Sequence, residues 1–336
     1  VFSVDKTTVL PEIFRFILKS LFFNQTLRAA TSGSVRMNLT YPLLKTLKIP
    51  IPPLSVQQKI VEYWETAIEQ LAAAKNSIKE NEVQLSTDIL RSSGIEISMG
   101  KPLGKIFTTT FGSVERWGVG FNRHPWTLHN LIKSEKYQSA PLGEYAYINP
   151  SVDLKLNDDD MVSFIPMEAV SDKDGRITKN ESKTLKEVKS GYTRFQEGDV
   201  IWAKITPCMQ NGKTAIASNL TNGIGFGSTE FHVIRSRDTS SLTNEFIYLL
   251  LRLSEIRVAA TRYFVGSAGQ QRVPKEFLES IYIPIPPLRM QEELVNRVAE
   301  TRNEIEKIRK GMHLQRENAL REVELMILGI RPVEEI

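Results

Sequence analysis

One stretch of this 336-residue chain concentrates side chains that suit contact with a nucleic acid. Lys204 and Lys213 bound a polar turn that also holds Gln210 and Asn211, between two short apolar runs. A lysine ammonium group neutralises phosphate, and a glutamine or asparagine amide forms two hydrogen bonds with an adenine edge. An ordinary polar surface turn would contain the same residue types, so both interpretations stay open at this point.

A second stretch, Gly266–Pro274, has the same character. Its glycines allow the backbone to approach a ligand closely, and its arginine suits guanine or phosphate. Two more donors, an aromatic hydroxyl and a guanidinium, precede the first apolar run. The candidate DNA contacts are Tyr192, Arg194, Lys204, Thr206, Gln210, Asn211, Lys213, Ser228, Gln270, Gln271 and Arg272.

Other chemistries are less well supported by the motifs. A phosphate-binding loop at Gly212–Thr214 would need a glycine where Pro207 stands. The glycines of Gly118–Gly120 and Gly223–Gly227 lack a complete dinucleotide fingerprint and predict turns. The segment Asn149–Val152 lacks the second proline and the aromatic residue of an amino-methyltransferase motif, which argues against methyl transfer by this chain.

A metal-dependent nuclease is the enzymatic alternative. Glu181 and Lys183, downstream of Asp172 and Asp174, are the residue types with which such an enzyme holds a metal ion and activates water. A solvated loop rich in Lys, Asp and Asn would show the same pattern. Metal-dependent cleavage of DNA by the purified chain would distinguish these two interpretations.

The composition limits the class of protein. With 43 Lys+Arg against 39 Asp+Glu the formal net charge is only +4, so a DNA-binding surface must be one local basic face. The single cysteine, Cys208, excludes an internal disulfide, and four scattered histidines do not have metal-ligand spacing. No apolar run approaches the length of a membrane span. We expect a cytoplasmic protein without a metal or cofactor of its own.

An internal repeat organises the chain. The motif Ile-Pro-Ile-Pro-Pro-Leu-x-x-Gln starts at Ile49 and again at Ile283, 234 residues further on. The match extends backward, with a one-residue slip, to Glu12–Phe14 and Glu245–Ile247. This similarity predicts a duplicated structural unit.

A long amphipathic segment follows each motif and predicts helices over Ser55–Arg91 and Arg289–Leu328. Because a whole domain intervenes, we expect the helices to pair antiparallel; packing on separate domains is the alternative. Glu82, in a charged centre with Arg302 and Arg309, would favour one register. The predicted interface consists of Trp64, Leu71, Ile78 and Leu85 in one helix and Val298, Ile305, Met312 and Ala319 in the other.

The region between the helices has a different residue pattern. Short apolar runs at Val200–Ala203, Thr214–Ala217 and Phe231–Ile234 predict strands, and Asn244–Ala260 predicts one helix. The chain is therefore expected to be α+β, with a domain of short strands and helices plus two long helices in an antiparallel coiled coil.

These motifs together resemble the specificity subunit of type I restriction-modification systems. The similarity rests on the two Ile-Pro-Ile-Pro-Pro-Leu-x-x-Gln motifs and on Gly198–Lys213, Gly227–Phe231 and Gly266–Pro274, in the order found in that family. The resemblance implies target-recognition domains that each bind half of a split DNA site, held apart by two antiparallel helices. A related type II restriction component, or a coiled-coil adaptor that does not touch DNA, is the competing interpretation.

The resemblance also implies a domain plan and partners. Residues 1–48 would be the end of a first target-recognition domain, 49–98 a helical spacer, 99–282 a second target-recognition domain and 283–336 a second spacer. The partners would be double-stranded DNA, methyltransferase (modification) subunits and an ATP-dependent restriction subunit. S-adenosylmethionine would bind the methyltransferase, and this chain would be non-catalytic.

Overall fold

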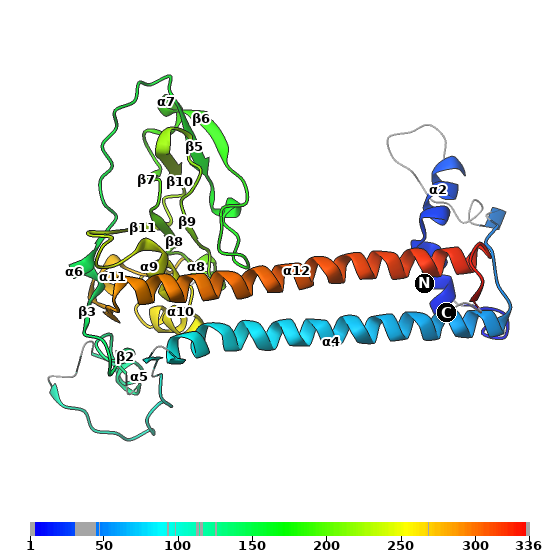
Figure 1. Cartoon of the computed structure of the whole chain (residues 1–336), viewed down its shortest axis with the longest axis horizontal. Coiled ribbons are helices and arrows are strands. Elements are labelled where there is room, and N and C mark those ends of the chain that lie inside the picture. Colours follow the sequence, from blue (N-terminus) through cyan, green and yellow to red (C-terminus); the bar gives the residue numbers. More distant parts are fainter. Residues whose placement is uncertain are drawn as a thin grey trace. The chain divides into compact units, whose positions relative to one another are not determined.

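The computed structural model describes residues 4–30, 45–46, 48–92, 94–97, 99–111, 114, 117–124, 126–267 and 269–333 (Figure 1). The chain forms two compact units, Val1–Val83 with Thr301–Ile336, and Gln84–Glu300. Because this division falls inside both long helices, the domain limits predicted at residues 48, 98 and 282 stay predictions. Within the described ranges, no helix has the length and apolar composition needed to cross a membrane.

Among its described residues, the first unit contains the short helices α1 and α2 and most of both long helices. Helix α1 (Pro11–Lys19) begins with proline at its first position, which suits the missing backbone donor there. Ser20 ends α1 and starts α2 (Leu21–Ala30), since its Oγ donates to the Ile17 carbonyl and accepts from the backbone N–H of Phe23. The long helices are α4 (Leu54–Ser92) and α12 (Leu288–Ile327), within one residue of the predicted limits.

Helices α4 and α12 run antiparallel within the first unit. Ile60 of α4 shares a buried cluster with Val323 of α12, and further along α4 the Gln70 Oε1 accepts from Gln315 Nε2 at 2.9 Å. As α4 advances, its contacts therefore move backward along α12. Of the predicted interface residues, Leu71, Ile78, Val298, Ile305 and Ala319 are buried, whereas Trp64 and Met312 are half-buried. The side chains of Leu85 and Glu82 lie outside the described residues.

The second unit contains two four-stranded sheets (Figure 1). One has the order β4 (Ala146–Ile148), β11 (Phe231–Ser236), β8 (Val200–Ala203) and β9 (Thr214–Ile216), with antiparallel neighbours throughout. The other has the order β6 (Glu181–Thr184), β5 (Met161–Ile165), β10 (Ile224–Gly227) and β7 (Thr193–Gln196), where only β10 and β5 are parallel. Two short pairs complete the strands, β1 (Ile95–Ile97) with β2 (Ile132–Ser134) and β3 (Ser139–Pro141) with β12 (Tyr282–Pro284).

Strand β8 lies between two hydrophobic cores. Val200 and Trp202 point to the larger core and Ile201 to a smaller one, so all four residues of the strand are buried. Burial on both faces explains why its sequence is continuously apolar instead of alternating. The strands predicted from the three apolar runs are therefore confirmed as β8, β9 and β11.

The sequence predicted a turn at Gly223–Gly227, but not all of these glycines lie in one. Gly225 and Gly227 lie in β10, where Gly225 is paired with Phe195 of β7. A Cβ atom on Gly225 would lie 2.2 Å from the Phe195 ring, and one on Gly227 would lie 2.4 Å from the Ile165 carbonyl oxygen. Close packing, not chain reversal, requires glycine at both positions.

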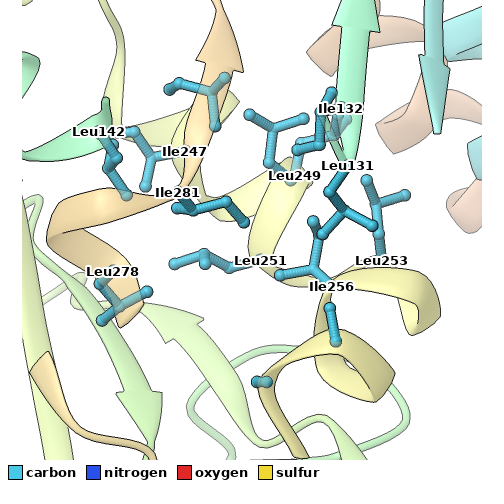
Figure 2. Close-up of a cluster of buried hydrophobic side chains, with 14 of the residues drawn as sticks. Leu131, Ile132, Leu142, Ile247, Leu249, Leu251, Leu253, Ile256, Leu278 and Ile281 are labelled. Carbon is cyan, nitrogen blue, oxygen red and sulfur yellow. The ribbon is translucent and has the colours of Figure 1, made fainter. Parts of the chain in front are cut away.

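The predicted helix Asn244–Ala260 is two helices, α9 (Asn244–Leu251) and α10 (Ser254–Thr261). Leu253 is extended, with φ −64° and ψ 136°, and its side chain is buried beside Ile256 (Figure 2). At the break, the Arg252 guanidinium donates to the carbonyls of Asp172, Lys173 and Gly212. Tertiary contacts thus interrupt a helix that local periodicity favours.

Five short helices and two 3-10 turns connect these elements. Among the described residues, the helices are α5 (Val119–Asn122), α6 (Leu142–Tyr145), α7 (Leu185–Val188), α8 (Cys208–Asn211) and α11 (Lys275–Ser280). The 3-10 turns are Met167–Ala169 and Thr221–Gly223.

We expect Leu71→Ala to destabilise the first unit by about 2 to 5 kcal/mol, because it removes a buried leucine side chain and leaves a cavity. Ile68→Ala is the matched control, since Ile68 lies one turn earlier on α4 and is 39% exposed, against 8% for Leu71. Urea unfolding followed by circular dichroism gives both free energies. Equal losses in the two variants would contradict burial of the Leu71 position.

Candidate nucleic-acid interface

Three loops that are distant in the sequence meet beyond the end of β8. The backbone N–H of Lys204 donates to the Glu230 carbonyl at 2.8 Å, and the Lys204 carbonyl accepts from Val273 N–H at 2.9 Å. The N–H of Thr206 donates to the Gln271 carbonyl at 2.9 Å. The segments 204–213, 227–231 and 266–274 therefore form one bonded surface, which the sequence had identified only as separate motifs.

An ion pair fastens two of these loops together. The Arg272 Nε and Nη2 atoms lie 2.9 Å and 2.7 Å from the two carboxylate oxygens of Glu230, and Nη1 donates to the Gln270 carbonyl at 2.9 Å. The hydrogen bonds from Arg272 hold the pKa of Glu230 below its ordinary value. Arg272, predicted as a DNA contact, thus has an acidic partner within the chain.

A cationic cleft of about 270 Å³ opens beside these loops. Arg194 of β7 and Lys204 both line it, facing the segment 149–152. Arg194 Nη1 donates to the Val152 carbonyl at 3.1 Å, whereas the Lys204 ammonium makes no hydrogen bond or ion pair within the described ranges. Two cationic side chains at one opening form a site suited to a phosphate group.

A buried histidine supports the wall of this cleft. His232 Nε2 is 2.8 Å from the Val273 carbonyl, which makes it the protonated nitrogen, and Nδ1 accepts from Asn149 Nδ2 at 3.1 Å. Asn149 Oδ1 in turn accepts from the Val233 N–H. Burial lowers the pKa of His232, so the ring is neutral near pH 7. The network fixes both the Asn149 turn and the loop that ends at Val273.

Four side-chain amides remain available at the surface. Gln210 and Asn211 are exposed on α8, which Arg257 holds by donating from Nη1 to the Gln210 carbonyl at 3.0 Å. Gly212 ends α8 with φ +89°, a left-handed conformation that favours glycine. Gln270 is exposed and Gln271 half-buried. None of the four amides is hydrogen-bonded in the described part of the chain, so all can offer donors and acceptors to base edges.

Three other predicted contact residues have partners within the chain, and the Thr206 hydroxyl has none among the described groups. Lys213 Nζ donates to the carbonyls of Met167 and Val170 at 2.9 Å and 2.7 Å. Ser228 Oγ accepts from Glu230 N–H, Thr206 Oγ1 is buried without a partner among the described groups, and the half-exposed Tyr192 ring packs edge-on against Phe164. Their contacts with DNA stay predictions.

Sequence reasoning missed two residues of this site. Glu230 lies inside a motif that the sequence singled out, but nothing local indicates that it pairs with Arg272. Asn149 belongs to a segment considered only as a methyltransferase motif. Its φ of +54° is a conformation in which asparagine is enriched, and only the fold brings its amide to His232.

The nuclease alternative has no support. The Glu181 carboxylate accepts from Lys179 Nζ at 2.7 Å, and the Lys183 ammonium stacks 3.7 Å from the Phe164 ring centroid. Over the described ranges, no three His, Cys, Asp or Glu side chains are grouped to hold a metal ion.

We expect His232 to make folding stability depend on pH. Its folded pKa lies below the unfolded value of 6.5, so stability is complete above 6.5 and is lost as the pH falls from there toward the folded pKa. Chemical unfolding at about pH 7.5 and about pH 5.5 should show a smaller pH-dependent loss in His232→Gln than in wild type. His313→Gln is the control, because the His313 side chain is 76% exposed. Equal pH dependence in all three proteins would contradict the assignment.

The chain is similar to known proteins in both sequence and fold. A family model described as the type I restriction modification DNA specificity domain matches residues 4–83 and 132–313. The specificity subunit of the type I restriction enzyme EcoAI of Escherichia coli is 41% identical over 165 residues, which are 49% of this chain and 28% of that protein. The EcoEI specificity subunit of the same organism is 38% identical over 161 residues, 48% of this chain and 27% of that protein.

A solved structure also shares the fold. A chain from a structure titled for complex assembly and conformational transition of the type I R-M system superposes with a TM-score of 0.62 at 14% identity, covering 97% of this chain and 73% of that one. The matched region spans little more than a quarter of each curated relative. Because the family model matches most of the chain, in two stretches that each contain one copy of the Pro-rich repeat, the protein belongs to the family defined by the type I restriction modification DNA specificity domain.

Proposed function

We propose that this chain is the non-catalytic, sequence-reading component of a type I restriction-modification complex, and that its second unit binds one half of a bipartite DNA site. The observation that carries the proposal is that Arg194 and Lys204 line one cleft, and that main-chain hydrogen bonds join the segment of Lys204 to the loop that holds Gln270 and Gln271. The exposed amides of Gln210 and Asn211 belong to the same segment as Lys204. Phosphate contacts fix a protein on the duplex and amide contacts distinguish bases, so the two kinds of donor have complementary roles.

The three loops of the candidate interface are fixed relative to one another. The loops are bonded to each other through main-chain groups, and the segment 204–213 follows β8, which is buried between two cores. A preorganised surface loses little conformational entropy on binding, which leaves more of the contact free energy for affinity. The amides would then enter the major groove while Lys204 and Arg194 hold the backbone.

Methyltransferase subunits are the proposed protein partners, with S-adenosylmethionine bound on them and an ATP-dependent restriction subunit joining the complex. In the first unit, an open groove of about 660 Å³ lies between the Pro50–Pro53 segment and the end of α12. Ile51 and Ile330 are 45% and 67% exposed. Apolar side chains left accessible beside a groove favour a protein contact there.

Selection of bound duplexes from a random pool, with the methyltransferase partner present, tests this proposal. We expect a common sequence element to be enriched. Enrichment of no element, together with no binding of unrelated duplex at low salt, would favour the adaptor interpretation. Methylation of DNA by the purified chain with the methyl donor but without a partner would contradict a non-catalytic role.

We expect Lys204→Ala to weaken binding to all duplexes about equally and to reduce the slope of log affinity against log salt by about 0.9. Asn211→Ala should instead cost about 1 to 3 kcal/mol on the selected duplex and much less on unrelated DNA. Fluorescence anisotropy titrations at several salt concentrations measure both effects. An unchanged salt slope in Lys204→Ala would show that this lysine does not contact a phosphate group.

Lys213→Ala provides a contrast within the same loop. Because the Lys213 ammonium binds two carbonyls of the chain, its removal should lower the melting temperature more than Lys204→Ala does. Comparison of the two lysine variants therefore separates loss of a DNA contact from loss of loop structure.

A further inference from the structure

The ion pair between Arg272 and Glu230 lies within the surface proposed to meet DNA. Glu230 follows Ser228 on one loop, and Arg272 follows the exposed Gln270 on another. The Arg272 side chain is 38% exposed and that of Glu230 is 22% exposed. Both groups therefore remain accessible to a ligand while they bind each other.

The pair removes one positive charge from a site that would otherwise attract phosphate strongly. Lys204 is close enough to lower the pKa of Glu230 in addition to the larger effect of Arg272. The neighbouring His232 is neutral near pH 7, and Glu276 adds a second acid near that ring. Because both side chains are partly exposed to solvent, a phosphate can reach the guanidinium, and its oxygens can accept the same paired hydrogen bonds as the carboxylate.

We propose that Glu230 is a specificity-determining residue that withholds Arg272 from DNA until a duplex is correctly docked. Unrelated DNA, held loosely by its phosphates, leaves the pair closed and gains no contact from Arg272. A duplex that fits the amides brings a phosphate to the guanidinium, displaces Glu230 and gains that contact. This inference rests on the proposed function, and it adds a residue whose role is repulsive toward the wrong sequence.

Glu230→Gln tests the proposal, because glutamine keeps an oxygen for Arg272 but loses the charge. We expect affinity for unrelated duplex to rise about five- to tenfold near 0.1 M salt, with a salt slope steeper by about 0.9. Affinity for the selected duplex should rise less, so the ratio of affinity for the selected duplex to affinity for unrelated duplex should fall. Glu276→Gln is the matched control, since it makes the same charge change four residues beyond Arg272 and should leave the ratio unchanged.

Arg272→Gln completes a double-mutant cycle. Alone, it should weaken the selected duplex more than unrelated duplex, because unrelated duplex makes no contact with the arginine and loses only the effect of its charge. In the Arg272→Gln background, Glu230→Gln should bring a smaller gain than in the wild type, because no guanidinium is left to release. The proposal is overturned if the gain is as large without Arg272, if Glu230→Gln weakens both duplexes equally, or if Arg272→Gln weakens both equally.

The outcomes for the two proposals are separable. Binding by the wild-type chain in complex with its methyltransferase partner reports on the proposed function, whichever way the variants behave. If the wild type selects a sequence but Glu230→Gln does not lower the ratio of selected to unrelated affinity, the proposed role of Glu230 is wrong and the proposed function stands. Melting temperatures of all variants establish that the comparison is between folded proteins.

Discussion

A fully buried glutamine amide at the start of each long helix is the constraint on which both units depend. Gln57 Oε1 accepts from Leu10 N–H, and its Nε2 donates to the carbonyls of Thr8 and Pro52. Gln291 repeats this pattern with Thr243, Ser241 and Pro286. Because prolines supply no N–H group, the side-chain amide is what ties the Pro-rich segment to the chain before α1 or α9. Loss of either amide would leave several buried polar groups without partners.

A hydrophobic core lies beside each of these two junctions. In the first unit, α1 residues such as Ile13 pack with Ile60 of α4 and the end of α12. In the second, Phe246 of α9 packs with Leu294 near the start of α12, and the same core extends to Trp202 of β8. The candidate segment 204–213 follows the end of that strand, and main-chain hydrogen bonds join it to the segments 227–231 and 266–274.

The electrostatics of the site are local. A formal net charge of +4 gives the whole chain little attraction for DNA, so the proposed binding would depend on a few cations held in place. Lys204 and Arg194 share one cleft, where Arg194 also donates to the Val152 carbonyl. The Lys213 ammonium binds two carbonyls of the chain, and Arg272 binds Glu230. Under the proposed function, such a division would limit affinity for arbitrary sequences and would give the neutral amides greater weight in the choice of site.

The sequence alone determined the repeat, both long helices and the strands β8, β9 and β11, because these follow from periodicity and proline spacing within short windows. It also identified the three loops that meet at the candidate site. Tertiary structure decided the rest. The break between α9 and α10 depends on carbonyls of Asp172, Lys173 and Gly212 that Arg252 reaches across the fold. The closed pair of Arg272 with Glu230 likewise joins residues from separate loops. Hydrogen bonds and charge pairs act over a few ångströms in space, and no local pattern records which distant residue will occupy that distance.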